Sequence, residues 1–225
     1  MPKSQGMFAV IPARSGSSLA DKNIRMLSGK TLLQLAVEEA KKVEAIDQVI
    51  VTSDSQKYLD SVSELGVQVM LRPAWASTSQ ATAQDVLDTI VLPSSCNAVV
   101  YLQPTSPLRR AFHIESAITL FDANPDCEIV SVVKVRQYPE KMLSKRADGK
   151  LSEALGMSGA ANSNRQEFVN LFYPNGAIYI LPRTDSGFAF ANQDRIGFLM
   201  DYLTSVDIDT EEDLLMAEAL LSNET

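Results

Sequence analysis

The sequence predicts an α/β protein with a doubly wound, mostly parallel sheet, and three observations carry that prediction. Short runs rich in valine and isoleucine alternate with longer segments of helical period along most of the 225 residues. The connections between them are short, as in sheets of parallel strands covered by helices. The composition, 45% hydrophobic and 21% charged, is typical of a globular protein with a well-buried core.

The first five expected elements alternate strand and helix. Residues 7–13 read MFAVIPA and predict a buried strand, because nearly every position is apolar. Residues 31–43 predict an amphipathic helix with leucine and alanine on one face. A second strand over residues 48–54 is followed by a helix over residues 55–65 and a third strand over residues 67–71. This order is the one that builds parallel sheets.

The alternation continues up to residue 135 and then breaks. A helix over residues 80–91 precedes a strand over 97–104, and a helix over 111–123 precedes a strand over 128–135. Residues 136–173 contain an Asp-Gly pair and other turn residues but little periodicity. They are therefore predicted to be an insertion.

Regular structure is expected to return after the insertion. Residues 176–181 predict a strand, residues 195–206 a further regular segment and residues 211–221 the last helix. The sequence thus predicts an α/β domain of residues 1–135 and 174–225, interrupted by the insertion of residues 136–173.

Charge and composition exclude several classes of partner. Residues 201–225 hold eight acidic residues and no Lys or Arg, which accounts for the whole formal net charge of −8. Nucleic acids and anionic membranes need a basic surface, so we expect neither as a partner. No apolar run approaches the ~20 residues that span a bilayer, and no signal peptide is recognisable. With two cysteines and no Cys/His cluster, we expect a reduced, cytoplasmic protein without a zinc site.

The loop after the first strand is a candidate phosphate site. In open parallel sheets, ligands bind beyond the carboxyl ends of the strands. Small residues at positions 15–18 let backbone N–H groups approach an anion, and Arg14 and Lys22 would supply charge for a polyphosphate. Neither GxxxxGK[ST] nor GxGxxG is present. A flexible polar connection is the alternative interpretation of this loop.

A second candidate loop, residues 103–110, reads QPTSPLRR and follows a buried strand. Its two prolines make a rigid turn that suits the rim of a substrate site, although a strand exit and helix start would look the same. The single histidine, His113, is expected at the surface or as a helix cap. One histidine in that place gives no Ser/His/Asp or Cys/His set, so covalent hydrolase chemistry is not expected.

The acidic segment near the end of the chain is a candidate metal site. Asp207 and Asp209 flank Ile208, so an extended chain would point both carboxylates to one side and Ile208 into the core. Mg²⁺ favours a few carboxylates together with phosphate oxygens and water, so the pair predicts a metal near a phosphate. The alternative is purely structural, because Thr210 and Asp213 match a helix-capping pattern.

Six segments occur in one order along the chain: IPARSGS…DKN, TSD, LRP, QPTSPLR, FYPNGAIYI and VDIDTEEDL. Through them the sequence resembles the acylneuraminate cytidylyltransferases, or CMP-sialic acid synthetases, from Val10 to about Leu221. The resemblance implies a nucleotide-diphospho-sugar-transferase fold, a Mg²⁺ requirement and a homodimer built by the insertion. It also implies that the anomeric hydroxyl of a nine-carbon 2-keto sugar acid attacks the α-phosphate of CTP and that pyrophosphate leaves.

The resemblance further implies roles for individual residues. Arg14, Lys22 and Asp209 are implied to be catalytic. The residues implied to bind CTP are Arg14, Ser15, Ser18, Lys22, Asn23, Arg72 and Thr82. Those implied to bind the sugar acid are Gln103, Lys141, Arg165, Asn175 and Tyr179, and the implied metal ligands are Asp207 and Asp209.

The first loop departs from the family pattern. Arg14 and Lys22 are eight positions apart, one fewer than is usual, Ser18 stands where the family has a base, and Asp21 adjoins Lys22. This change predicts weaker CTP binding, a compensating base or a changed substrate. A catalytically silent nucleotide- or sugar-binding homologue is therefore one alternative. A cytidylyltransferase for the eight-carbon acid Kdo, which resembles the same family, is another. Asn23, FYPNGAIYI and VDIDT favour the nine-carbon acids.

Overall fold

The computed structural model describes residues 6–16, 19–155, 170–190 and 194–222. The chain divides into two compact units, one of Met1–Val132 with Pro174–Thr225 and one of Val133–Tyr173. No helix in the described ranges is long and apolar enough to cross a membrane.

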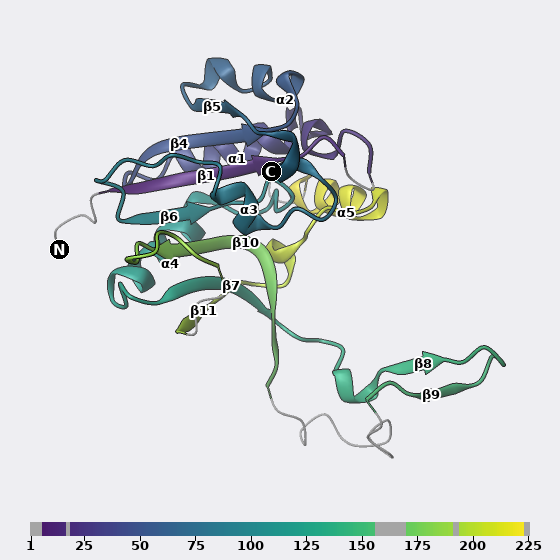
Figure 1. The fold of residues 1–225 in the computed structure, drawn as a ribbon. Coiled ribbons are helices and arrows are strands. Elements are labelled where there is room, and N and C mark those ends of the chain that lie inside the picture. Colours follow the sequence, from purple (N-terminus) through teal and green to yellow (C-terminus); the bar gives the residue numbers. More distant parts are fainter. Residues whose placement is uncertain (1–5, 17–18, 156–169, 191–193, 223–225) are drawn as a thin grey trace. The chain divides into compact units, whose positions relative to one another are not determined.

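A seven-stranded sheet forms the centre of the first unit (Figure 1). Its strands are β1 (Met7–Ala13), β4 (Ile46–Ser53), β5 (Gln68–Leu71), β6 (Ala98–Tyr101), β7 (Glu128–Lys134), β10 (Phe172–Pro182) and β11 (Arg195–Leu199). Their order across the sheet is β11-β7-β10-β6-β1-β4-β5. β1 pairs in parallel with β4 and β6, β4 with β5, and β7 with β11, whereas β10 is antiparallel to β6. The predicted mostly parallel α/β sheet is confirmed.

The helices and short turns connect these strands. The α-helices are α1 (Leu32–Lys41), α2 (Gln56–Asp60), α3 (Ala83–Leu87), α4 (Ala111–Asp122) and α5 (Glu211–Ser222). The 3-10 turns of this unit are η1 (Lys22–Ile24), η2 (Ser63–Leu65), η3 (Ala74–Ser77) and η7 (Leu203–Ser205), and β2 (Met26–Leu27) pairs with β3 (Lys30–Thr31). The regular segment expected over residues 195–206 is a strand followed by a 3-10 turn.

Two helices are shorter than the sequence predicts. The helix expected over residues 80–91 spans only α3, because Thr82 and Asp85 form a capping box that starts it at Ala83. The helix expected over residues 55–65 ends at Asp60 and continues as η2. Gly66 closes that turn in the left-handed region, with φ of 68°.

The central strand β1 packs on both faces, which explains why its sequence is apolar throughout. Ala9 and Ile11 lie in the core cluster shared with α1 and α4, while Phe8 and Val10 lie in the cluster shared with α3. This division follows the period of two along a strand. The carboxyl end of β1 is therefore supported from both sides where the first loop begins.

A third apolar cluster supports the C-terminal segment. Leu19, Leu27 and Leu32 of the N-terminal part meet Ile208 and Ala217 in it. Ile208 is fully buried, and its backbone N–H donates to the Thr105 carbonyl at 2.8 Å. This anchoring fixes the segment that carries Asp207 and Asp209.

The second unit contains a β-hairpin that the sequence did not predict. β8 (Leu143–Lys145) and β9 (Leu151–Glu153) pair antiparallel, after the 3-10 turn η4 (Pro139–Lys141). Gly149 in the connection has φ of 83°, and the Arg146 N–H donates to the Lys150 carbonyl at 2.8 Å. The Asp-Gly pair was thus the signal of a hairpin turn.

Candidate active site

A cavity of about 290 Å³ opens at the carboxyl ends of β1, β5 and β6. Parallel strands end at the same edge of a sheet, so the loops that follow them meet there. The cavity brings together six residues that the sequence assigned to substrates: Arg14, Lys22, Asn23, Arg72, Thr82 and Gln103. The phosphate loop and the QPTSPLRR loop therefore belong to one site.

The first loop is held by contacts at each end of its polar stretch. The Arg14 guanidinium donates to the Thr78 carbonyl at 2.6 Å, and the Asn23 amide donates to the Arg14 carbonyl at 3.0 Å. The backbone N–H and hydroxyl of Ser15 both donate to the Asp54 carboxylate, at 2.9 and 2.8 Å. Asp54, which follows β4, was not predicted as part of the site, although it belongs to the TSD segment.

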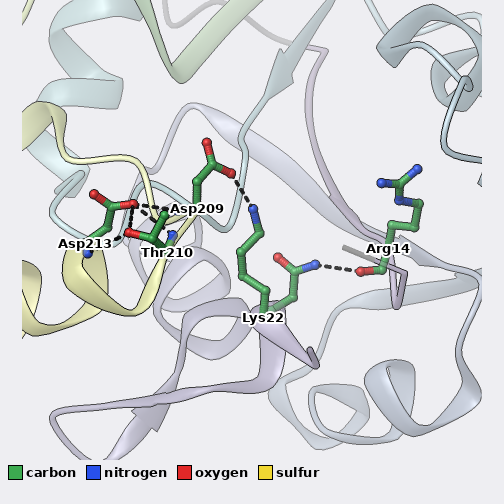
Figure 2. A network of polar contacts seen from close by, with 6 residues as sticks. Arg14, Lys22, Asp209, Thr210 and Asp213 are labelled. Carbon is green, nitrogen blue, oxygen red and sulfur yellow. Dashed lines mark hydrogen bonds and ion pairs between the residues drawn. The ribbon is translucent and has the colours of Figure 1, made fainter. Parts of the chain in front are cut away.

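Lys22, which lines the cavity, forms an ion pair with Asp209, which does not, as Figure 2 shows. Their Nζ and Oδ1 atoms are 2.8 Å apart, and the Lys22 side chain is 11% exposed against 67% for Asp209. A buried ammonium needs such a partner, because burial removes its hydration. The predicted phosphate ligand and the predicted metal ligand are therefore in direct contact.

Asp207 and Asp209 lie on either side of the buried Ile208, and the burial of Ile208 agrees with the predicted alternation. Partial burial raises the pKa of Asp207 above its ordinary value, and the Asp209 charge adds to this rise, while a hydrogen bond with Thr105 opposes it. Two neighbouring carboxylates are hard oxygen ligands of the kind that Mg²⁺ prefers. No cluster of three His, Cys, Asp or Glu side chains suitable for a metal occurs among the described residues.

The capping interpretation of the acidic segment is confirmed. The Asp213 carboxylate accepts from the backbone N–H groups of Asp209 and Thr210, at 3.1 and 2.9 Å, and from the Thr210 hydroxyl at 2.8 Å (Figure 2). The Asp213 N–H donates to the Thr210 hydroxyl at 3.3 Å. The cap uses Asp213 and leaves Asp209 to Lys22, so structural and chemical roles are divided among these acids.

Arg72 and Tyr101 form an inner wall of the cavity. Both side chains are buried, and burial lowers the pKa of Arg72, although the Asp54 charge opposes this shift. The Arg72 Nε donates to the Ser77 hydroxyl at 3.2 Å. Thr82 lies on the rim as the exposed N-cap of α3. Sequence reasoning missed Tyr101, since an aromatic residue in a buried strand looks like core.

Two residues predicted to meet the sugar acid lie outside the cavity lining. Asn175 is 5% exposed; its Oδ1 accepts from the Ser131 hydroxyl at 2.5 Å, and its Nδ2 donates to the Ser205 hydroxyl at 2.8 Å. Its carboxamide thus ties β7, β10 and η7 together. Tyr179 packs edge to face against Tyr101, with ring centroids 6.5 Å apart.

Three other predicted site residues lie in the second unit or outside the described residues. Lys141 ends η4 in the second unit and is half-buried there. Ser18 and Arg165 lie outside the residues that the structure describes. Their predicted roles toward CTP and the sugar acid stay predictions.

Asp21, the acidic neighbour of Lys22, forms hydrogen bonds with residues of α2. Its carboxylate accepts from Lys57 at 2.8 Å and from the Tyr58 hydroxyl at 3.1 Å. These two hydrogen bonds lower the pKa of Asp21 below its ordinary value. Asp21 is not among the residues that line the cavity. Its charge is thus balanced by Lys57.

His113 was expected either at the surface or as a helix cap. It is a helix cap, and its side chain is buried. It is 6% exposed, and its Nδ1 accepts from the Arg110 N–H at 3.0 Å at the start of α4. Burial lowers the pKa of His113 below 6.5. It does not line the cavity and takes no part in the site.

Comparisons with known proteins identify the family of the chain. A family model described as Cytidylyltransferase matches residues 8–179. The N-acylneuraminate cytidylyltransferase of Streptococcus agalactiae serotype V is 33% identical over 215 residues, which are 92% of this chain and 51% of that protein. The CMP-N,N'-diacetyllegionaminic acid synthase of Legionella pneumophila is 28% identical over 229 residues, covering 96% of each chain.

A similar solved structure is that of CMP:2-keto-3-deoxy-manno-octonic acid synthetase complexed with CTP. It covers 97% of this chain and 99% of its own, with a TM-score of 0.68 and 17% sequence identity. Likeness at that identity concerns the fold. The chain spans about half the length of the N-acylneuraminate cytidylyltransferases that it matches.

Proposed function

Because the chain belongs to the cytidylyltransferase family, we propose that it activates a nine-carbon 2-keto sugar acid with CTP. The products are the CMP-sugar and pyrophosphate. The single observation that carries the proposal is the cavity at the carboxyl ends of β1, β5 and β6, where Arg14, Lys22 and Arg72 gather. Three cations around one cavity suit a substrate pair that brings a triphosphate and a carboxylate.

The reaction is a nucleotidyl transfer. The anomeric oxygen of the sugar acid forms a bond to the α-phosphorus of CTP, the bond from that phosphorus to the bridging oxygen breaks, and the hydroxyl loses its proton. Such a transfer depends mainly on positioning and on neutralising charge. Arg14 and Lys22 would neutralise the charge of the triphosphate. Asn23 would bind the ribose. Arg72 and Thr82 would bind the cytosine.

A Mg²⁺ ion fits the carboxylates of Asp207 and Asp209, as argued from their oxygen donors. Bound there, the ion would supply charge stabilisation to the phosphate oxygens. Mg²⁺ commonly takes one or two carboxylates and completes its shell with phosphate and water. Lys22, which now contacts Asp209 at 2.8 Å, would then be available to the triphosphate.

The second unit supports the proposal of a homodimer. It exposes Met142, Leu143, Leu151, Leu155 and Tyr173. Exposed apolar groups of this number on a small unit are typical of interaction surfaces. In the proposed dimer, Lys141 and Arg165 would bind the sugar carboxylate, and Gln103 and Tyr179 would shape the sugar side of the site.

The nine-carbon acids are favoured over Kdo by the relatives. The proteins at 33% and 28% identity are named for N-acylneuraminate and for diacetyllegionaminic acid, which have nine carbons. The octonic acid synthetase resembles this chain at 17% identity. The choice among nine-carbon acids depends on the groups that surround the sugar pocket.

A coupled pyrophosphate assay tests the proposal. The purified full chain is incubated with each of the four NTPs, with and without Mg²⁺, and with sialic, legionaminic, pseudaminic and Kdo acids. Release only with CTP, Mg²⁺ and a nine-carbon acid is the expected result. Release with Kdo alone would instead support the eight-carbon acid. No release with any pair, together with binding of CTP, would identify a silent homologue.

A further inference from the structure

Arg109 of the QPTSPLRR loop is the largest fully buried side chain described, and it has no assigned role in the reaction. It is 1% exposed. Burial lowers its pKa to about 10, and only the charge of Glu39 opposes this shift. Burying a guanidinium is costly, so its hydrogen bonds should reveal what it organises.

The guanidinium joins two strands at the point where their ladder stops. The Nη1 atom donates to the carbonyls of Gln103 and Ala177, at 2.8 and 2.9 Å. β6 and β10 are antiparallel, and their pairing begins at Tyr101 opposite Tyr179. Continuing that register by two residues sets Gln103 opposite Ala177. Arg109 therefore bridges the two strands beyond the end of their ladder.

The side chain of Gln103 is also restricted in position. A Cβ atom added at Gly176 would lie 2.8 Å from the Gln103 Oε1 atom, so the carboxamide rests against a surface that only glycine provides. Gly176 has φ of 76°, which also favours glycine. The Gln103 carbonyl and carboxamide are thus both located by β10, and the same residue lines the cavity.

We propose that Arg109, together with Gly176, is a positioning element that holds the Gln103 carboxamide toward hydroxyl groups of the sugar acid. This inference rests on the proposed function and assigns Arg109 no contact with substrate. Because the nucleotide is assigned to Arg14, Lys22 and Arg72, disturbing Gln103 should impair the sugar acid selectively.

Arg109→Lys tests the proposal, since a lysine ammonium cannot reproduce the rigid donor geometry of a guanidinium. We expect KM for the sugar acid to rise about tenfold and KM for CTP to stay within about twofold. CTP affinity is read independently from the fluorescence of Trp75, the sole tryptophan, which adjoins the cavity residue Ala76. Arg183→Lys is the matched control, because Arg183 also joins two backbone carbonyls, those of Cys96 and Pro93, and does not line this cavity.

Gly176→Ala provides a second route, because it displaces Gln103 without touching Arg109. It should raise KM for the sugar acid alone, even if Arg109→Lys fails to fold. In a double-mutant cycle, Arg109→Lys should add little to the KM of Gln103→Ala, because both act through one side chain. A purely structural Arg109 would give additive effects, or equal changes for both substrates, and either result would overturn the inference.

The role of Arg109 and the activity of the chain are distinguished by the behaviour of the wild-type protein. If the wild-type chain releases pyrophosphate with a sugar acid and Arg109→Lys and Gly176→Ala keep its KM, only the role of Arg109 is wrong. If the wild-type chain accepts no sugar acid while CTP still changes Trp75 fluorescence, the proposed function itself is overturned and the inference with it.

Discussion

Lys22 and Asp209 pair a cation proposed for phosphate with a carboxylate proposed for metal, 2.8 Å apart. Asp209→Asn keeps the shape of the side chain and removes its charge. We expect turnover to fall by about 100-fold or more, because a metal ligand acts on charge that develops in the transition state. The pyrophosphate assay at saturating CTP and Mg²⁺ measures the loss, and circular dichroism checks that the chain stays folded.

Glu212→Gln is the control for this prediction, because Glu212 is an exposed acid of the same segment that does not line the cavity of the candidate site. It should keep near wild-type turnover. A variant Asp209→Asn with near-normal activity would remove Asp209 from the metal site.

His113 makes stability depend on pH. Its folded-state pKa lies below the value of 6.5 for an exposed histidine, because burial disfavours the imidazolium. The unfolded chain therefore binds the proton more readily as pH falls through 6.5. The stabilisation is fully present above that pH, and it is lost as the pH falls from 6.5 through the folded-state pKa.

Thermal unfolding of the wild-type chain and of His113→Gln between pH 8 and pH 5 measures this dependence. The wild-type melting temperature should fall more steeply below pH 6.5 than that of the variant, which has no imidazole to titrate. Parallel curves for the two proteins would contradict the assignment.

At the scale of elements, the cap of α5 both starts a helix and orients Asp209. Thr210→Ala removes the hydroxyl that donates to Asp213 and accepts from its N–H. Loss of an N-terminal cap of this kind costs about 1 kcal/mol of unfolding free energy. Urea denaturation measures it. Thr119→Ala is the control, because Thr119 is exposed within α4, and a lowering of stability equal to that of Thr210→Ala would argue against the cap.

The long periodic elements were predictable and the short ones were not. β1, α1, α4 and α5 follow the expected ranges to within two residues, because each has sustained periodicity and a clear end. Helices α2 and α3 are cut short by local capping and turn geometry that compete with the apolar pattern. β8 and β9 have three residues each, too few to show a period of two.

Some of the site residues could likewise be predicted from the sequence, and others could not. Arg14 and Lys22 could be predicted from their loop after a strand, because ligands bind beyond the carboxyl ends of parallel strands. Arg72 was implied only by the resemblance to the family. Arg109 could not be predicted, since its role depends on where two strands separate. Asn175 was implied by the resemblance to bind the sugar acid, and its carboxamide hydrogen-bonds Ser131 and Ser205.

For the whole molecule, the assembly can be tested on the hairpin of the second unit. Leu143 pairs with Glu153 and Leu151 with Lys145, so both leucines lie on one face of the hairpin, where they are 49% and 62% exposed. If this face joins two copies, Leu151→Glu should shift the chain from dimer to monomer, because it buries a charge without a partner. Sedimentation velocity measures the shift.

Ser144→Glu is the matched control, because Ser144 pairs with Ser152 on the opposite face of the hairpin. It adds the same charge and should leave the dimer intact. A wild-type chain that sediments as a monomer at all concentrations would refute the proposed homodimer.

The position of β1 has a further consequence for motion. Because it is flanked by β4 and β6 and covered by apolar clusters on both faces, its amides should exchange with deuterium among the slowest in the chain. Arg14 follows that strand directly. In hydrogen–deuterium exchange, a sharp boundary between protected and exchanging amides is expected between Ala13 and Gly16, so Arg14 would be presented from the rigid end of the strand.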